Sequence, residues 1–110
     1  MLTPLSSPIK EVDIEFLVFV ERYATDLLKW DILTFFADHP ATCASAAEIA
    51  QRIGRTMQSV WPELGDLVLL GILAQNRVSE GQTFYQLTQD PYLRKMTLKF
   101  ADQLTSRPLS

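Results

Sequence analysis

The chain has 110 residues, with ten basic and thirteen acidic side chains, and its net charge at pH 7 is −3. This length predicts one domain, 1–110, that buries about two-thirds of its unfolded surface, and it excludes a second catalytic domain. The composition, 47% hydrophobic and 21% charged, is ordinary for a soluble protein. The longest apolar run is far shorter than the roughly 20 residues of a membrane span.

The N-terminal segment and the cysteine content bear on location. The segment MLTPLSSPIK has no basic stretch followed by a long apolar one, so we expect no signal peptide. Cys43 is the only cysteine and has no partner for an internal disulfide. These features favour a cytoplasmic protein that does not contact a membrane.

The first predicted helix covers residues 8–28. It starts at Ser7 and Pro8, a cap residue followed by proline at the first helical position. One apolar stripe runs along it, and a second apolar set lies off that stripe, so the helix is apolar around more of its circumference than one buried face requires. We expect it to pack on the core and on a second subunit, the alternative being burial on several sides within a monomer. The stripe is Phe16, Phe19, Val20, Tyr23 and Leu27, and the second set is Ile14, Leu17 and Val18.

A second helical pattern runs from Leu27 to Asp38 and turns Ile32 and Phe36 inward. Thr25 or Asp26 is a candidate cap, and the pattern leaves open whether this helix continues the first one. His39-Pro40 ends it. Residues 41–44 are then expected to be a linker.

Two further helices are predicted in the centre of the chain. The first is Ala46 to Ile53, capped by Ser45 and ended by Gly54. The second begins after Thr56 and reaches about Leu70, where Gly71 provides a C-terminal stop. Its buried face contains Val60, Leu64 and Leu67.

A β-hairpin follows, and then a last helix. The hairpin joins 72–78 to 83–88 through a turn that contains Gly81. The last helix covers 90–105 and starts at Asp90-Pro91. Its apolar residues recur at helical spacing and form one seam, Leu93, Met96, Phe100 and Leu104.

The order helix, turn, helix, hairpin over 46–88 resembles the winged helix-turn-helix of bacterial transcription regulators of the MarR, ArsR and PadR kind. The N-terminal dimerisation domain of small-molecule O-methyltransferases is similar in the same way. The resemblance implies a mainly α fold with a small β-hairpin, in which a winged helix-turn-helix core at 28–88 is flanked by N- and C-terminal dimerisation helices. The residues that carry it are Glu48-Ile49-Ala50, Ile53-Gly54, Val60, Leu64, Leu67, Gly71-Ile72-Leu73 and Tyr85-Gln86-Leu87-Thr88.

The resemblance also implies partners and a site. The protein is expected to be a homodimer that binds double-stranded DNA, with its second central helix in the major groove and its wing near phosphates. The implied DNA-binding residues are Arg52, Arg55, Thr56, Gln58, Ser59, Pro62, Arg77, Gln82 and Thr83. The implied dimerisation residues are Val12, Phe16, Phe19, Val20, Tyr23, Leu93, Met96, Phe100 and Leu104.

The charge of the central unit favours an alternative function. Residues 46–88 hold three arginines and four acidic residues, whereas a groove-binding domain usually carries a basic footprint. The outward strip of the second central helix has no Lys or Arg, and Pro62 interrupts its backbone hydrogen bonds. The alternative is therefore a protein-interaction module that does not bind DNA and uses Trp61, Pro62 and Leu69. A small-ligand sensor is a further alternative.

The sequence offers little catalytic chemistry. His39 is the only histidine, so a pair of histidine metal ligands or a redundant triad is excluded, and we read it as a helix-end residue. No basic residue lies within three positions of Cys43 to activate its thiol. The sequence has no phosphate loop and no dinucleotide fingerprint. We expect a protein that is not an enzyme and holds no cofactor or metal.

Overall fold

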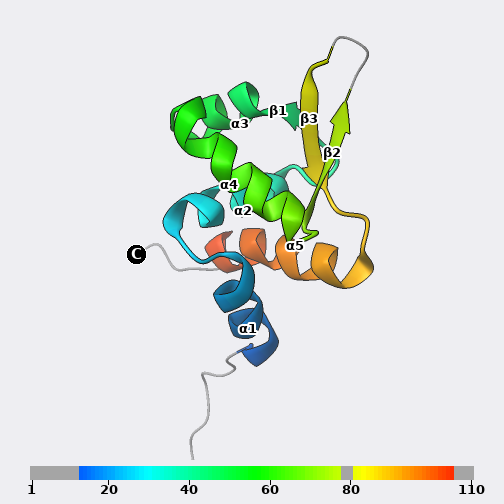
Figure 1. Cartoon of the computed structure of the whole chain (residues 1–110). Helices are drawn as coiled ribbons and strands as arrows, with labels where there is room; N and C mark the ends of the chain where they lie inside the picture. Colours follow the sequence, from blue (N-terminus) through cyan, green and yellow to red (C-terminus); the bar gives the residue numbers. More distant parts are fainter. Residues whose placement is uncertain (1–12, 78–80, 106–110) are drawn as a thin grey trace, which may run out of the picture.

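The computed structural model describes residues 13–77 and 81–105, which form five helices and three strands (Figure 1). In chain order these are α1 (Ile14–Tyr23), α2 (Leu27–Asp38), β1 (Cys43–Ser45), α3 (Ala46–Ile53), α4 (Met57–Leu69), β2 (Leu73–Arg77), β3 (Thr83–Leu87) and α5 (Pro91–Thr105). None of the helices in this part of the chain has the length and hydrophobicity to cross a membrane.

Two aspartates set the starts of the first two helices. The Asp13 carboxylate accepts the backbone N–H of Phe16 at 3.1 Å, and α1 ends at Tyr23. Asp26 then caps α2 by accepting the N–H of Lys29 at 2.8 Å. The two helices are therefore separate, and α1 is shorter than the predicted helix over 8–28. The predicted start at Ser7-Pro8 lies outside the described residues.

The helix-turn-helix has the predicted bounds because each end carries a local signal. Ser45 and Glu48 form a reciprocal capping box at the start of α3. Gly54 ends α3 in the left-handed conformation at φ 75°, which glycine adopts without steric cost. Thr56 caps α4, and Gly71 at φ 84° follows its last turn.

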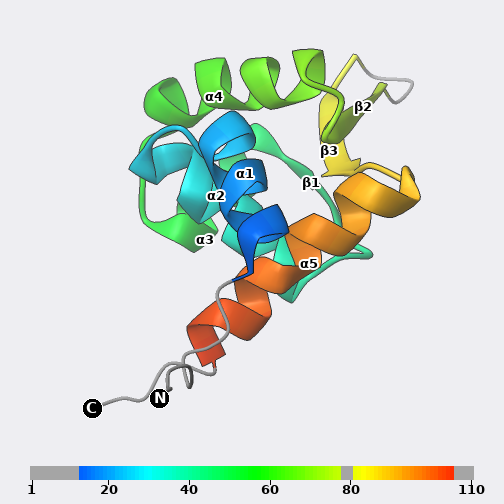
Figure 2. The ribbon, with the colours of Figure 1, turned by 90° about the horizontal axis from the view of Figure 1, so that it is seen from below.

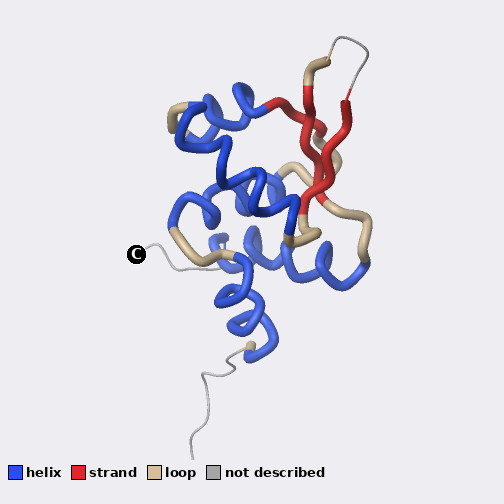
Figure 3. Tube along the Cα trace, viewed as in Figure 1, coloured by secondary structure: helices blue, strands red, loops and turns tan. Residues whose placement is uncertain are grey.

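The sheet has three antiparallel strands in the order β1-β3-β2 (Figure 3). The hairpin pairs β2 with β3, as predicted. The linker expected over 41–44 is wrong in part, because Cys43 to Ser45 form β1 and Ala44 pairs with Tyr85. Three residues carry no alternation long enough to indicate a strand. The pairing with β3, some forty residues later, makes this strand.

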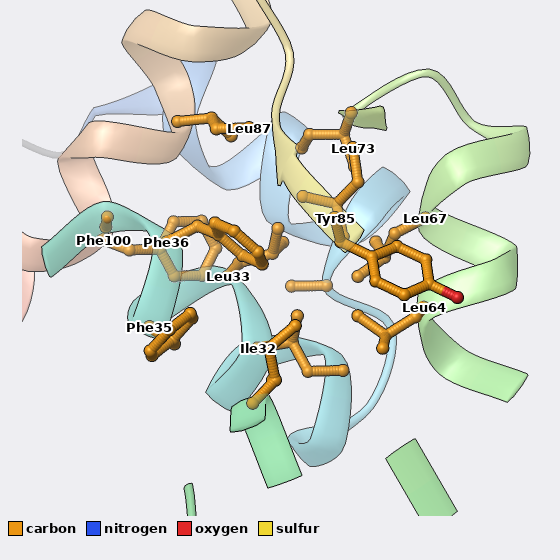
Figure 4. Close-up of a cluster of buried hydrophobic side chains, with 14 of the residues drawn as sticks. Ile32, Leu33, Phe35, Phe36, Leu64, Leu67, Leu73, Tyr85, Leu87 and Phe100 are labelled. Atoms are coloured by element: carbon orange, nitrogen blue, oxygen red, sulfur yellow. The ribbon is translucent and has the colours of Figure 1, made fainter. Parts of the chain in front are cut away.

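The core surrounds α2, which packs against α3, α4 and α5. Ile32, Leu33 and Phe36 of α2 are fully buried. Leu64 and Leu67 of α4 and the inward side chains of the sheet meet them there (Figure 4). This core fixes the position of α4, whose opposite face is turned to solvent.

An aromatic cluster joins the terminal helices. Phe100 of α5 lies edge-on to Phe16 of α1, with 5.1 Å between ring centroids, and to Trp30 of α2 at 4.8 Å. The helix α1 packs against α5 (Figure 2), and its C-terminal end lies near the end of α4, where Arg22 and Asp66 line the same pocket. The two terminal helices therefore belong to the same hydrophobic core.

Candidate nucleic-acid interface

The exposed surface of α4 lies between an acidic flank and an apolar flank. Val60, Leu64 and Leu67 point into the core. At about 100° per residue, Gln58 and Leu69 then lie on the opposite side of the helix. Both are exposed, and Leu69 is 86% exposed. This side is the surface that the molecule presents through its helix-turn-helix.

A buried lysine holds the acidic flank of α4. The Lys29 ammonium of α2 is bonded to Glu63, and it also donates to Asp66 and Asp26 at 3.3 Å each. Burial acts to lower the pKa of Lys29, but the bonds to Glu63 and Asp66 outweigh it and raise the pKa above its ordinary value. Lys29 therefore offsets one negative charge of the acidic flank. The charge count over 46–88 did not include Lys29, because it lies in α2.

The predicted base-reading residues at the start of α4 divide into two kinds. The Thr56 hydroxyl accepts the backbone N–H of Ser59 at 3.2 Å and donates to the Ser59 hydroxyl at 2.9 Å. These two hydroxyls serve the helix cap. Gln58 is exposed, and its amide bonds to no other described residue. Pro62 lies inside α4 and is also exposed.

The three predicted phosphate-binding arginines are all exposed. Arg55, in the turn before α4, donates to Asp31 of α2 at 2.8 Å. Arg52 of α3 lies over the ring of Phe35, with 5.8 Å from its guanidinium carbon to the ring centroid. Arg77 ends β2. An exposed pair such as Arg55 and Asp31 contributes about 0–1 kcal/mol, so a phosphate can compete for that guanidinium.

The wing residues Gln82 and Thr83 lie at the start of β3, one exposed and the other half-buried. Between the wing and α4 is an apolar groove of about 240 Å³. Met57 and Trp61 of α4 line it on one side, Thr83 and Tyr85 of β3 on the other, and the first residues of α3 close it. The sequence analysis did not select Met57. Met57 directly follows the Thr56 cap, and this position at the start of α4 could have indicated that it lies near the predicted base-reading residues.

The structure places most of the predicted dimerisation residues inside the chain. Phe16, Phe19, Met96 and Phe100 are buried, and Val20, Tyr23 and Leu93 are half-buried against them. Val12 and the side chain of Leu104 lie outside the described residues. The apolar residues that α1 turns outward belong to the second set of the sequence pattern, and each is at least half exposed: Ile14, Leu17 and Val18.

The remaining reactive groups do not assemble into a site. His39 follows α2 and contacts the ring of Phe35. Cys43 is exposed on β1, with the Asn76 amide 3.8 Å from its sulfur. Among the described residues, no three acidic, histidine or cysteine side chains are grouped in a way that would hold a metal ion.

Solved structures of known proteins share this architecture. The AntR antimony-specific transcriptional repressor matches 96% of this chain and 100% of its own, with a TM-score of 0.62 and 17% identity. MepR of Staphylococcus aureus in its complex with DNA matches 84% of this chain and 73% of its own, with a TM-score of 0.59 and 16% identity. The fold is a winged helix-turn-helix.

A third match bears on assembly. The homodimeric winged helix-turn-helix DNA-binding domain of Mb0332 from Mycobacterium bovis, a possible ArsR-family regulator, matches 84% of this chain and 80% of its own, with a TM-score of 0.59 and 16% identity. Neither protein-family models nor curated protein sequences give a match. At these identities the likeness extends to the winged helix-turn-helix fold of transcriptional regulators, and the mainly α fold with a small antiparallel sheet confirms the predicted fold class.

Proposed function

We propose that this protein is a DNA-binding transcriptional regulator that acts as a homodimer. The observation that carries the proposal is the free surface of α4, where the Gln58 amide is unpaired among the described residues and Arg52, Arg55 and Arg77 are exposed nearby. In this fold α4 enters the major groove with its N-terminal residues toward the bases, while flanking arginines contact phosphates. The DNA bound by MepR and the regulators among the matched structures support the same function.

The homodimer is proposed from α1. Ile14, Leu17 and Val18 give this helix an outward apolar face that no described part of the chain covers. An uncovered apolar helix face is a common site of subunit association. A second copy would bring two α4 helices to one duplex and double the number of phosphate contacts.

Fluorescence anisotropy with a mixed-sequence duplex tests DNA binding. We expect the double variant Arg55→Ala/Arg77→Ala to bind at least tenfold more weakly than the unchanged protein, because it removes two phosphate contacts per subunit. The matched control is Arg22→Ala/Lys95→Ala, which removes two exposed positive charges from α1 and α5. Equal affinity of the two double variants would contradict the phosphate assignment.

A protein-interaction module is the second candidate function. Trp61 and Leu69 favour it, because they are 60% and 86% exposed on a helix without Lys or Arg. Exposed tryptophans often dominate protein interfaces. In that case the protein would bind no duplex, and Trp61→Ala would abolish a salt-insensitive complex with the partner. A complex that survives Trp61→Ala would exclude Trp61 as its anchor.

A further inference from the structure

We propose that the groove between α4 and the wing reads the C5-methyl groups of thymines, so that each half-site of the target DNA contains A·T pairs. The proposal rests on the proposed function, because it names the bases that α4 would contact. It starts from the residue types that α4 presents. Base edges in the major groove differ in their donors and acceptors, and only thymine adds a methyl group.

The reading surface lacks the side chains that select guanine. Guanine is most often recognised by hydrogen bonds from Arg or Lys to its O6 and N7 atoms, and α4 contains neither residue. The two nearest arginines, Arg52 of α3 and Arg55 of the turn, lie outside α4, and the proposed function assigns them to phosphates. Gln58 remains as the polar reader at the start of α4, and its amide suits the adenine edge.

The apolar groove would contact the methyl group of the thymine that is paired with this adenine. Met57, the residue beside Gln58, and Trp61, one turn further along α4, are 47% and 60% exposed and line the groove. Lys29 keeps the carboxylates of Glu63 and Asp66 on the far flank of the helix. None of the residues that line the groove is acidic, so the groove offers apolar contact to a methyl group.

Covering the exposed apolar side chains of the groove with a methyl group would also add to the affinity for DNA. Met57 and Trp61 are large apolar side chains left in water on the groove side of α4, whereas Val60, Leu64 and Leu67 on its inner side are buried. Covering a methyl group corresponds to about a fourfold gain in affinity. A homodimer that contacts one thymine in each half-site would gain about fifteenfold from the two methyl groups.

The test begins with duplexes selected from a random library by the full chain at low salt. We expect the selected duplexes to contain A·T pairs at matching positions of two half-sites. Replacing thymidine by deoxyuridine in such a duplex removes only the methyl groups, and we expect affinity to fall by about fifteenfold. The double variant Met57→Ala/Trp61→Ala should lose this preference, whereas Leu69→Ala, an exposed change on the same helix, should keep it.

Each result distinguishes the inference from the function on which it rests. Equal binding of the thymidine and deoxyuridine duplexes, with clear duplex binding, would overturn the methyl-reading groove and leave the proposed function in place. A selected site made of G·C pairs would overturn it as well. Selection of no duplex would overturn both. Circular dichroism of each variant shows whether it is folded.

Discussion

Replacing Lys29 by methionine tests how α4 is held in place. The Lys29 side chain is 8% exposed, and its ammonium is bonded to Glu63, which is 22% exposed, and to the more exposed Asp66 and Asp26. Removing one partner of a fully buried ion pair costs about 3–5 kcal/mol because the other charge is left without compensation. Here two of the three carboxylates regain water, so we expect Lys29→Met to lower the free energy of unfolding by about 2–3 kcal/mol.

Thermal and urea unfolding followed by circular dichroism measure this effect. A loss of 2–3 kcal/mol lowers Tm by about 10–20 °C in a domain of this size. The control Lys95→Met removes an exposed lysine from α5 and should change stability by less than about 0.5 kcal/mol. Adding Glu63→Gln to Lys29→Met should recover part of the loss, because it removes the stranded charge. If Lys29→Met behaves like Lys95→Met, the ion cluster does not hold α4.

Leu17→Glu on the outward face of α1 should shift a dimer to monomer in sedimentation while the circular dichroism spectrum stays that of the folded chain, and an unchanged mass would contradict the proposed dimer face. Gly54→Ala should cost about 1–2 kcal/mol in urea unfolding, because Gly54 has φ 75°; a neutral change would show that the turn adapts. Although burial opposes both shifts, hydrogen bonds from Lys29 lower the pKa of Asp26, and the bonds to Glu63 and Asp66 raise the pKa of Lys29. The stability that Asp26 contributes is therefore present above its ordinary pKa of 3.8 and should be lost as pH falls below 3.8. The stability that Lys29 contributes is complete below its ordinary pKa of 10.5 and should be lost as pH rises above 10.5. The urea midpoint measured as a function of pH should show both losses in the unchanged protein and smaller losses in Lys29→Met.

Local signals explain why the helix-turn-helix could be predicted from sequence. Ser45, Gly54, Thr56 and Gly71 each act within a few residues of their own position, so a single sequence reveals the ends of α3 and α4. The apolar spacing of Val60 and its neighbours gave the buried face of α4 for the same reason.

Features that depend on distant residues could not be predicted in this way. The strand β1 exists through its pairing with β3, and the role of Lys29 depends on carboxylates that lie 34 and 37 residues away in sequence. The periodicity of α1 showed that both its sides are apolar, but it could not show which side its own chain covers. The structure places Phe16 and Phe19 inside and Leu17 outside. The charge count over 46–88 likewise could not include Lys29, which bonds to Glu63 and Asp66 from outside that segment.

The salt dependence of duplex binding tests the central claim most directly. Three arginines per subunit, six in a dimer, predict that log affinity falls with log salt at a slope of about −3 for one subunit and about −5 for two. Anisotropy with a mixed-sequence duplex at about 50 and about 200 mM salt, on a sample whose mass is checked by sedimentation, measures that slope. We expect a dimer whose affinity falls by about a thousandfold between the two conditions, because a slope of about −5 acts over a fourfold change in salt. Absence of binding at the lower salt, or binding that salt does not weaken, would contradict a DNA-binding function for this winged helix.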